Sequence, residues 1–388
     1  MKGILPYIAK RTSGKSFKSH KYCLDDVKMP GVVYDDRQDL TLKKYGETEK
    51  IKQTKPLLKK SQQVQKFSKP LFKYFLDGSR RTYKVDDIAY DKRVYPVIAG
   101  QIGVGCCERL EDRCLNKKSF KHDLVLALPG CADKDGNKKE LFFNKLVNDL
   151  NEQDFIKSKN IKFHKVLSYE DREMQVEEKY ENLGIAKIHD EMIECEKKTA
   201  AQLTHDNLLN ENAYLLKDGS LEYQKMKTGD LKDLSVIKSN YKCVVGVSKS
   251  FNPEKCRDKN GLTNATKIAE LSLFSRTPAY MYESSRTAGK EGIVKFAIWY
   301  LRLRDARYTA SPYEGIVKIE KILVSEAEQN NGLDSEEIDL ISANLINERN
   351  PVCYGSDTRW ANHLYPVYLT ETYIKSKYLD SRYFINLF

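Results

Sequence analysis

The sequence predicts an α/β or α+β protein with a mixed central sheet flanked by helices. Apolar segments of strand length recur between Leu71 and Ile322, and amphipathic helical periods lie between them and near the end of the chain. Of the 388 residues, 40% are apolar and 10% aromatic, which suffices for a sizeable core and excludes disorder throughout. We expect a basic N-terminal arm with a short helix over residues 1–66 and one elaborated domain over 67–388.

The predicted strands follow one another from Leu71. The first is the apolar run LFKYFLDGS, and RTYKVDDIAY and YPVIAGQIGVGCCER continue the sheet. KHDLVLALPG, NAYLLKDGS and the valine-rich KCVVGVSKS predict three further strands. Near the C-terminal end, GIVKFAIWYLRL and YEGIVKIEKI predict an antiparallel pair.

Helical periods separate and follow these strands. DKDGNKKELFFNKLVNDL predicts a turn and an amphipathic helix, and residues 168–209 carry a long helical period. SEEIDLISANLINER and YPVYLTETYIKSKYL predict two helices near the end of the chain.

Basic residues are concentrated in the first part of the chain. The formal net charge is +11, and residues 1–60 contain 15 Lys and Arg against 7 Asp and Glu, which gives 15 − 7 = +8. Such an arm suits a polyanion, because neutralising phosphates releases condensed counterions. A solvated positive face that only aids solubility explains the same charge equally well.

Cysteine usage and hydropathy bear on the compartment. Nine cysteines form an odd set with no signal peptide before them, so we expect a reducing, cytoplasmic location. No run approaches eighteen uncharged apolar residues, so we expect no membrane-spanning segment.

Two predicted strands end in the same sequence, Asp-Gly-Ser. Asp77 closes the first strand and Asp218 closes a later one. A strand that ends in Asp-Gly can place its carboxylate at the edge of a sheet, where glycine lets a metal or phosphate approach. Two such ends brought together predict a site for Mg²⁺ or Mn²⁺, which favour oxygen ligands. Two plain Asp-Gly turns remain the alternative.

A third carboxylate is expected from the long helix before Asp218. On a helical wheel centred on Ile188, Glu191 is the acidic residue nearest the apolar face, and Glu194 and Glu196 lie farther from it. We therefore predict Glu191 as the helix ligand, with Glu194 or Glu196 as alternatives. A glutamate at the boundary of the buried face with its head in water would look the same.

Other common chemistries find little support in the sequence. The six histidines have no zinc-ligand spacing with each other or with cysteine. There is no G-x-S-x-G nucleophile motif, and G-x-x-x-x-G-K-[ST] is also missing. Any ATP-driven motor activity would have to come from a partner.

The ordered strand ends resemble those of the NurA family of DNA-end-processing nucleases over about residues 70–380. In that family a strand ends in Asp-Gly-Ser, a helix supplies Glu, a second strand ends in Asp-Gly, and a later one reads Val-Gly-Val-x-Lys. The matching pieces are YFLDGS, the 185–203 helix, YLLKDGSL, VVGVSK with Lys249, and YPVYLTETY with Tyr365, Pro366 and Leu369.

The resemblance implies an RNase H-like fold and a Mn²⁺- or Mg²⁺-dependent DNase acting on single strands or duplex ends. It implies that Asp77, Glu191 and Asp218 hold two ions, which activate water and neutralise the transition state. Lys249 would contact a phosphate, with Tyr365 and Tyr373 in the catalytic set. The pair Arg302/Arg304 and the basic arm would track the DNA backbone. Implied partners are DNA, a second copy of the chain and a hexameric HerA-type translocase ATPase.

One position departs from the family pattern. Tyr373 stands where the family leads us to expect a histidine, and Glu371 or His363 could substitute for it. A non-cleaving nucleic-acid adaptor with a degraded nuclease site is therefore the first alternative. A second alternative is an RNA substrate, because no residue separates a 2′-hydroxyl from a 2′-hydrogen. Repair of DNA ends and defence against foreign DNA are both open as biological roles.

Overall fold

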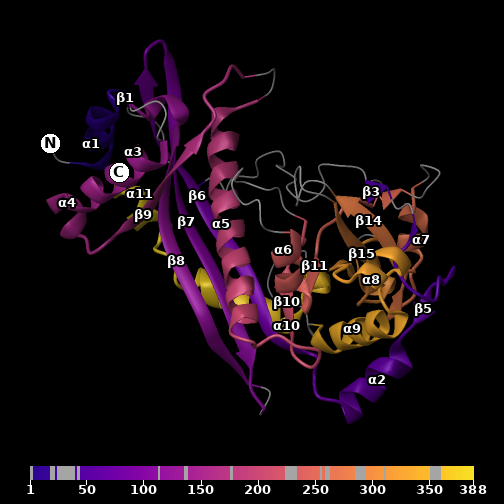
Figure 1. The fold of residues 1–388 in the computed structure, drawn as a ribbon. Coiled ribbons are helices and arrows are strands. Elements are labelled where there is room, and N and C mark those ends of the chain that lie inside the picture. The colour runs from indigo at the N-terminus through magenta and orange to yellow at the C-terminus, as the bar shows by residue number, and fades with distance from the viewer. Residues whose placement is uncertain are drawn as a thin grey trace.

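The computed structural model describes residues 3–17, 22–23, 40–41, 44–111, 114–134, 139–174, 178–222, 234–253, 256–257, 263–284, 293–309, 312–349 and 360–388. Within these ranges the chain is an α/β structure built on one large, mostly antiparallel mixed sheet with helices on both faces (Figure 1). This confirms the predicted fold class at that level of detail.

Three long strands form one half of the sheet: β6 (Phe72–Tyr90), β7 (Arg93–Arg109) and β8 (Leu115–Pro129). They are consecutive antiparallel neighbours, and Asp91, with a positive φ of 53°, lies in the tight turn between β6 and β7. β9 (Phe163–Tyr169) runs parallel to β8 at the edge of the sheet. The first two predicted strand segments thus belong to a single long strand, β6.

The other half of the sheet begins with two strands parallel to β6. They are β10 (Tyr214–Asp218), next to β6, and β11 (Val244–Ser248), next to β10. The sheet continues through β16 (Ile316–Ile322), β15 (Val294–Arg302), β14 (Tyr280–Ser284) and β4 (Lys44–Tyr45), all paired antiparallel. The antiparallel pair predicted from the two late apolar segments is confirmed as β15 and β16.

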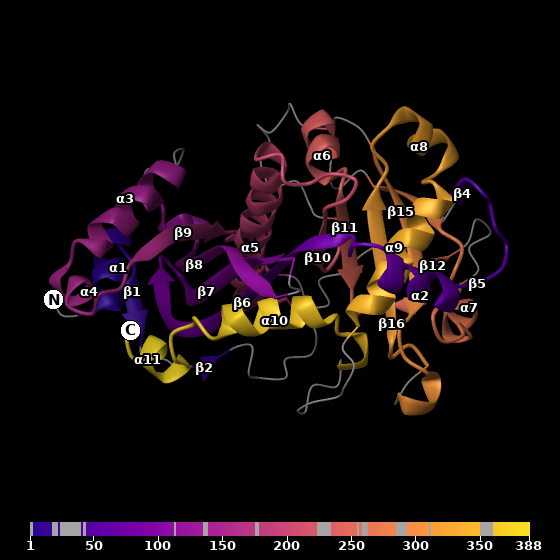
Figure 2. The same cartoon turned by 90° about the horizontal axis from the view of Figure 1, so that it is seen from below.

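Two helices cover opposite faces of the sheet at β6. The long helix α5 (Tyr180–His205) lies on one face and α10 (Tyr365–Lys375) on the other (Figure 2). Each face has its own apolar core: Leu76 of β6 joins Ile188 of α5, whereas Phe75 joins Val367 of α10. Neighbouring residues of one strand point to opposite faces, so this division assigns each strand residue to one helix or the other.

The remaining described helices are α1 (Ile4–Thr12), α2 (Leu58–Phe67), α3 (Lys139–Asn151), α4 (Asp154–Lys157), α6 (Leu234–Tyr241), α7 (Ala265–Ala269), α8 (Glu326–Asn331), α9 (Ser335–Glu348) and α11 (Ser381–Ile385), with short 3₁₀ turns at Gly130–Ala132, Ala306–Tyr308 and Trp360–Asn362. Among them, α9 packs on the face of β15 and β16 that carries Trp299. The helix predicted from SEEIDLISANLINER is α9, whose N-cap is Asp334.

The described parts of residues 1–66 pack against the large sheet and its helices. The apolar face of α1, with Ile4 and Ile8, is fully buried in the core on the α5 face. β1 (Lys15–Phe17) and β2 (Tyr22–Cys23) pair with β6, and β5 (Lys55–Pro56) pairs with β13 (Ser275–Arg276). A two-residue strand, β3 (Leu40–Thr41), pairs with β12 (Cys256–Arg257).

Among the described residues, no helix has both the length and the apolar character needed to cross a membrane. The large sheet dominates the architecture, and its central strands β6 and β10 carry the predicted aspartates Asp77 and Asp218.

Candidate functional site

Asp77 and Asp218 lie on neighbouring parallel strands and on the same face of the sheet. Lys217 of β10 is the register partner of Leu76 in β6, so the next residue of each strand is an aspartate. Leu76 belongs to the core on the α5 face, so Asp77 and Asp218 point to the face that α10 covers. Asp77 lies inside the long strand β6 and is 4% exposed, whereas Asp218 is the last residue of β10.

Lys249 and Glu371 complete a cluster around these aspartates. The Lys249 Nζ lies 2.9 Å from Asp218 Oδ2 and 3.4 Å from Glu371 Oε2, so one ammonium bridges strand β10 and helix α10. Glu371 also pairs with Lys375 one helical turn later, at 2.6 Å. We call Asp77, Asp218, Lys249 and Glu371 the carboxylate cluster.

The carboxylate cluster holds more negative than positive charge. Burial raises the pKa of Asp77 well above its ordinary value, and the charge of Asp218 raises it further against the opposing effect of Lys249. Burial alone would lower the pKa of Lys249, but the carboxylates around it, that of Asp218 first, raise it above its ordinary value. Lys249 therefore stays charged, while the cluster favours a protonated Asp77 unless another cation is supplied.

The predicted helix ligand, Glu191, is not part of this cluster. Its Oε2 lies 2.6 Å from the Nζ of Lys165, which belongs to β9 at the far edge of the sheet. Glu196, on the opposite flank of the same helix, is the α5 carboxylate near the site. The prediction of Glu191 is thus corrected, because the flank of α5 that faces β6 and β10 carries Glu196.

Glu196 lies on the α5 face of the sheet, opposite the face that carries the carboxylate cluster. A Cβ on Gly78 would come within 2.2 Å of Glu196 Oε1, so the absence of a side chain at Gly78 makes room for this carboxylate. Glu196 pairs at 2.9 Å with Lys217, whose Nζ also donates to the carbonyl oxygen of Asp218 at 2.8 Å. Glu196 and Lys217 thus fix the backbone of Asp218 from the α5 face and make no part of the cluster itself.

The turn after Asp218 is held by the buried carboxylate of Glu320. Gly219 has a φ of +85°, a left-handed conformation that glycine adopts without strain, and its N–H donates to Val247 at 2.8 Å. Glu320 of β16 accepts from Ser220 Oγ at 2.7 Å and from Leu221 N at 2.8 Å. The Asp-Gly-Ser sequence at this position is therefore a tightly held strand end.

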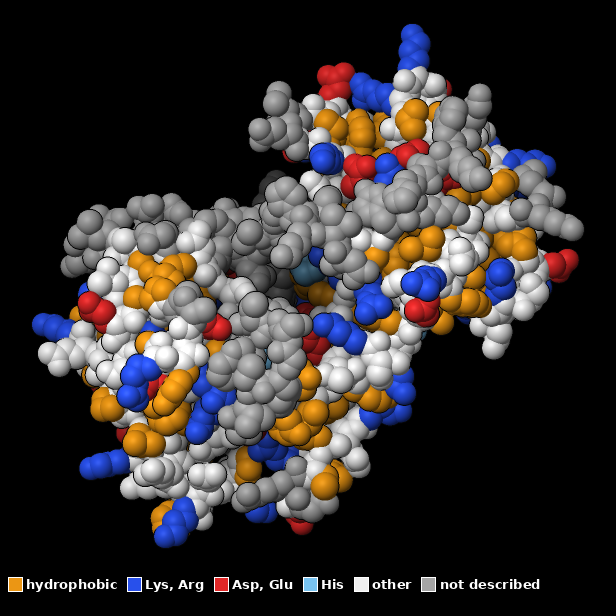
Figure 3. All heavy atoms as spheres, turned by 180° about the vertical axis from the view of Figure 1, so that it is seen from behind, with side chains coloured by type: hydrophobic (Ala, Val, Ile, Leu, Met, Phe, Trp, Pro, Cys, Tyr) orange, Lys and Arg blue, Asp and Glu red, His pale blue; other side chains and the backbone are white. Residues whose placement is uncertain are grey.

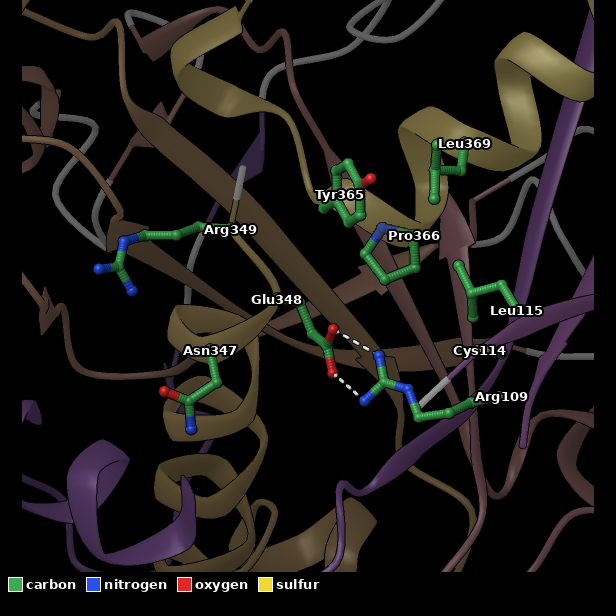
Figure 4. Close-up of a pocket in the computed structure, with 9 residues that line it drawn as sticks. All are labelled: Arg109, Cys114, Leu115, Asn347, Glu348, Arg349, Tyr365, Pro366 and Leu369. Carbon is green, nitrogen blue, oxygen red and sulfur yellow. Dashed lines mark hydrogen bonds and ion pairs between the residues drawn. The ribbon is translucent and has the colours of Figure 1, made fainter. Parts of the chain in front are cut away.

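Tyr365 and Tyr373 lie on the flank of α10 that faces away from the cluster. Tyr365 lines a pocket of about 640 Å³ between the start of α10, the end of α9 and the ends of β7 and β8. In Figure 4, Arg109 and Glu348 point toward each other below Pro366, joined by two hydrogen bonds of 2.8 and 2.6 Å. The ring of Tyr373 packs edge-on against Phe120 of β8, with 5.4 Å between the ring centres.

Two further expectations are resolved by burial and position. Of the two residues considered as replacements for a histidine, Glu371 lies in the cluster, and His363 is buried with its ring 5.4 Å from that of Tyr368. Arg302, expected to follow a DNA backbone, is 1% exposed and donates to the carbonyl oxygens of Ala269 and Pro312. That expectation is wrong for Arg302, whose guanidinium holds loops together inside the protein.

The donor chemistry of the cluster fits a divalent cation. Asp77, Asp218 and Glu371 offer only oxygen ligands, and Asp77 Oδ2 is buried without a hydrogen-bond partner among the described residues. As they stand, no three Asp, Glu, His or Cys side chains in the described ranges are close enough to hold a metal ion. Lys249 occupies the middle of the cluster, so ion binding there requires its ammonium to move.

Comparison with models of protein families finds none that matches this chain, and comparison with curated proteins finds no match. The resemblance drawn from the strand ends therefore stays a prediction, and the argument for function rests on the geometry of the site.

Proposed function

We propose that this chain is a metal-dependent nuclease of the NurA type with an RNase H-like domain. The observation that carries the proposal is the convergence of Asp77, Asp218 and Glu371 around Lys249, with more negative charge than the protein neutralises. Asp77 in β6, Asp218 at the end of β10 and Lys249 just after β11 follow one another in the order that the resemblance implies. The mixed sheet, with α5 and α10 on opposite faces, is compatible with that fold.

In this proposal Asp77, Asp218 and Glu371 hold Mn²⁺ or Mg²⁺. When bound, such ions lower the pKa of a coordinated water and neutralise charge on a phosphodiester undergoing hydrolysis. Lys249, released from Asp218 and Glu371, provides a mobile positive charge for a phosphate oxygen. Glu196 and Lys217 keep the backbone at Asp218 fixed while this exchange occurs.

The partners of the chain belong to the same proposal. They are DNA, a second copy of the chain and a HerA-type hexameric ATPase, with DNA-end repair or defence against foreign DNA in the cytoplasm as the setting. No G-x-x-x-x-G-K-[ST] motif occurs in the sequence, so translocation along DNA would be the task of the ATPase.

A DNA-cleavage assay tests the proposal. End-labelled single- and double-stranded DNA is incubated with Mn²⁺, Mg²⁺ or EDTA, with and without a co-expressed ATPase. We expect metal-dependent cleavage that falls by about 100-fold or more in Asp77→Asn and in Glu371→Gln. Glu191→Gln is the matched control and should cleave like the wild type, because its carboxylate pairs with Lys165 outside the cluster.

The non-cleaving adaptor is the second candidate function. The lack of a preformed three-ligand group among the described residues favours it, together with the orientation of Tyr373 away from the carboxylates. Absence of cleavage under every condition, with salt-sensitive DNA binding intact, would replace the nuclease proposal with this one.

A further inference from the structure

A row of partly exposed aromatic side chains lies along the flank of α10 that faces β8. Phe120 contacts Tyr373 with 5.4 Å between ring centres, and it is stacked with His122 at 6.5 Å. His122 in turn lies 5.5 Å from Tyr378, just after the end of α10. We call Phe120, His122, Tyr373 and Tyr378 the aromatic strip.

The aromatic strip continues into the pocket at the start of α10. Tyr365, Leu369 and Tyr373 follow one another at intervals of four residues, so their side chains share one flank of the helix. Leu115 lines the same pocket, and both it and Phe120 belong to β8. Pocket and strip together form one surface between α10 and β8.

Positive charges lie directly on these rings. Lys377 Nζ is 5.1 Å from the ring centre of Tyr373, and the guanidinium of Arg81 is 5.7 Å from that of Tyr378. Lys117 of β8 is exposed, and Arg109 lies at the pocket, held by Glu348. On the face seen in Figure 3, which carries α10, basic side chains lie beside hydrophobic ones.

One end of the strip borders the carboxylate cluster. A Cβ on Gly103 would lie 3.2 Å from Tyr378 Oη, and Gly103 is the register partner of Ser79, two residues from Asp77 on the same strand face. The Tyr378 hydroxyl is buried at this end, so the strip comes nearest to the cluster inside the protein.

We propose that the aromatic strip binds single-stranded nucleic acid by stacking unpaired bases on Tyr373 and Phe120. Bases in single strands expose their faces to aromatic side chains, whereas bases in a duplex are stacked on each other, and cations beside the rings complement the phosphates. The pocket at Tyr365 is large enough to receive one nucleotide at the far end of the strip. This inference deepens the proposed nuclease function, on which it rests, by assigning the residues that hold an unpaired strand.

Binding measured without metal separates this inference from the nuclease proposal. The fluorescence anisotropy of a labelled oligothymidylate, an abasic oligomer of equal length and a blunt duplex is followed with the full chain in EDTA. We expect Tyr373→Ala to weaken oligothymidylate binding about 5- to 150-fold and Tyr373→Phe to bind like the wild type. Neither substitution should change binding of the abasic oligomer.

The matched control is Tyr308→Ala. Tyr308 is 71% exposed and has a cation over its ring, that of Arg307 at 5.8 Å, but it lies in the 3₁₀ turn between β15 and β16. Because Tyr373→Ala could fail to fold, crosslinking of a 5-iododeoxyuridine oligomer to the wild type provides an independent measurement, with Phe120 and Tyr373 as expected sites.

Three results would overturn the inference. They are equal binding of oligothymidylate and abasic oligomer by the wild type, equal losses in Tyr373→Ala and Tyr308→Ala, and a change of oligomeric state in Tyr373→Ala with unchanged DNA affinity. The last would make the strip a contact between copies of the chain. If instead base-dependent binding is present but no metal-dependent cleavage is found, the nuclease proposal fails, and the inference that the strip binds single strands is supported.

Discussion

Two groups of buried charges in this protein differ in their net charge. One has as many cations as carboxylates, and the other, the carboxylate cluster, has an excess of carboxylates. Around Arg276, the buried carboxylates of Glu47 and Asp339 are matched by two cations, Arg276 and the part-exposed Lys55, in ion pairs of 2.6–2.8 Å. Outside this buried group, Lys55 also pairs with the exposed Glu49 at 3.2 Å. In the carboxylate cluster, three carboxylates surround the single inner ammonium of Lys249.

The two groups also differ in how completely their polar atoms are hydrogen-bonded. The Arg276 guanidinium donates to Glu47, Asp339 and the carbonyl oxygen of Thr277. By contrast, Asp77 Oδ2 is buried with no partner among the described residues. A balanced, fully bonded group stabilises the fold, whereas an unbalanced one costs stability, and a protein retains it where it serves a ligand.

Breaking the balanced network should have the largest effect on stability. Arg276→Met leaves the carboxylate of Glu47 buried without a cation and Asp339 with Lys55 alone, and we expect the free energy of unfolding to fall by about 3–5 kcal/mol. Urea denaturation of wild type and variant measures the difference. A loss below about 1 kcal/mol would mean that water or Lys55 replaces the guanidinium.

A methyl group at Gly78 should have an intermediate effect. The new Cβ would lie 2.2 Å from Glu196 Oε1, so Gly78→Ala must push this carboxylate away from Lys217. We expect a loss of about 1–3 kcal/mol in unfolding free energy. A double variant with Glu196→Ala, measured against Glu196→Ala alone, isolates the clash, and an undiminished loss in that background would place the strain elsewhere.

Removing the excess charge should do the opposite of breaking the balanced network. The folded-state pKa of Asp77 lies above its unfolded value, so the folded state binds the extra proton and wild-type stability falls as pH rises from about 4 through the folded pKa. Asp77→Asn removes this loss and should be more stable than the wild type by on the order of 1 kcal/mol at pH 8.

Thermal unfolding of both proteins between pH 4 and 9 measures this gap. The gap should close as the pH falls toward about 4, because below that pH Asp77 is protonated in both states of the wild type. A constant gap across the range, or a less stable variant at pH 8, would contradict the charge argument.

The smallest effect is expected at the partly exposed pair of Glu191 and Lys165. Since the Lys165 side chain is 40% exposed, Glu191→Gln should change the free energy of unfolding by at most about 1 kcal/mol. Urea denaturation beside Arg276→Met provides the comparison. A loss as large as that of Arg276→Met would show that solvent screening is weaker there than exposure indicates.

The two aspartates of the site could be predicted from the sequence, although only Asp218 ends a strand and Asp77 lies inside β6, and the helix ligand could not be predicted. An apolar run followed by Asp-Gly identifies Asp77 and Asp218 locally, because strand and turn signals are both short-range. Glu191 and Glu196 lie on opposite flanks of the apolar face of α5. Which flank faces β10 depends on how the helix packs, and a helical period carries no information about that.

Other features depend on contacts between distant segments. The aromatic strip joins Phe120 to Tyr373, which are 253 positions apart, and the pairing of β1 with β6 joins Lys15 to Ala89. Fold class and the strands β15 and β16 were accessible because their apolar runs are long. The short N-terminal strands have two or three residues each and give no local signal.

Direct binding of Mn²⁺ tests the central claim that the unbalanced carboxylate cluster is a cation site. Isothermal titration calorimetry with wild type, Asp77→Asn and the control Glu191→Gln measures it at pH 6 and pH 8. We predict binding by the wild type and the control that tightens at pH 8, because Asp77 must lose its proton, and at least about tenfold weaker binding by Asp77→Asn. No binding by the wild type, or equal affinity in Asp77→Asn, would contradict the account.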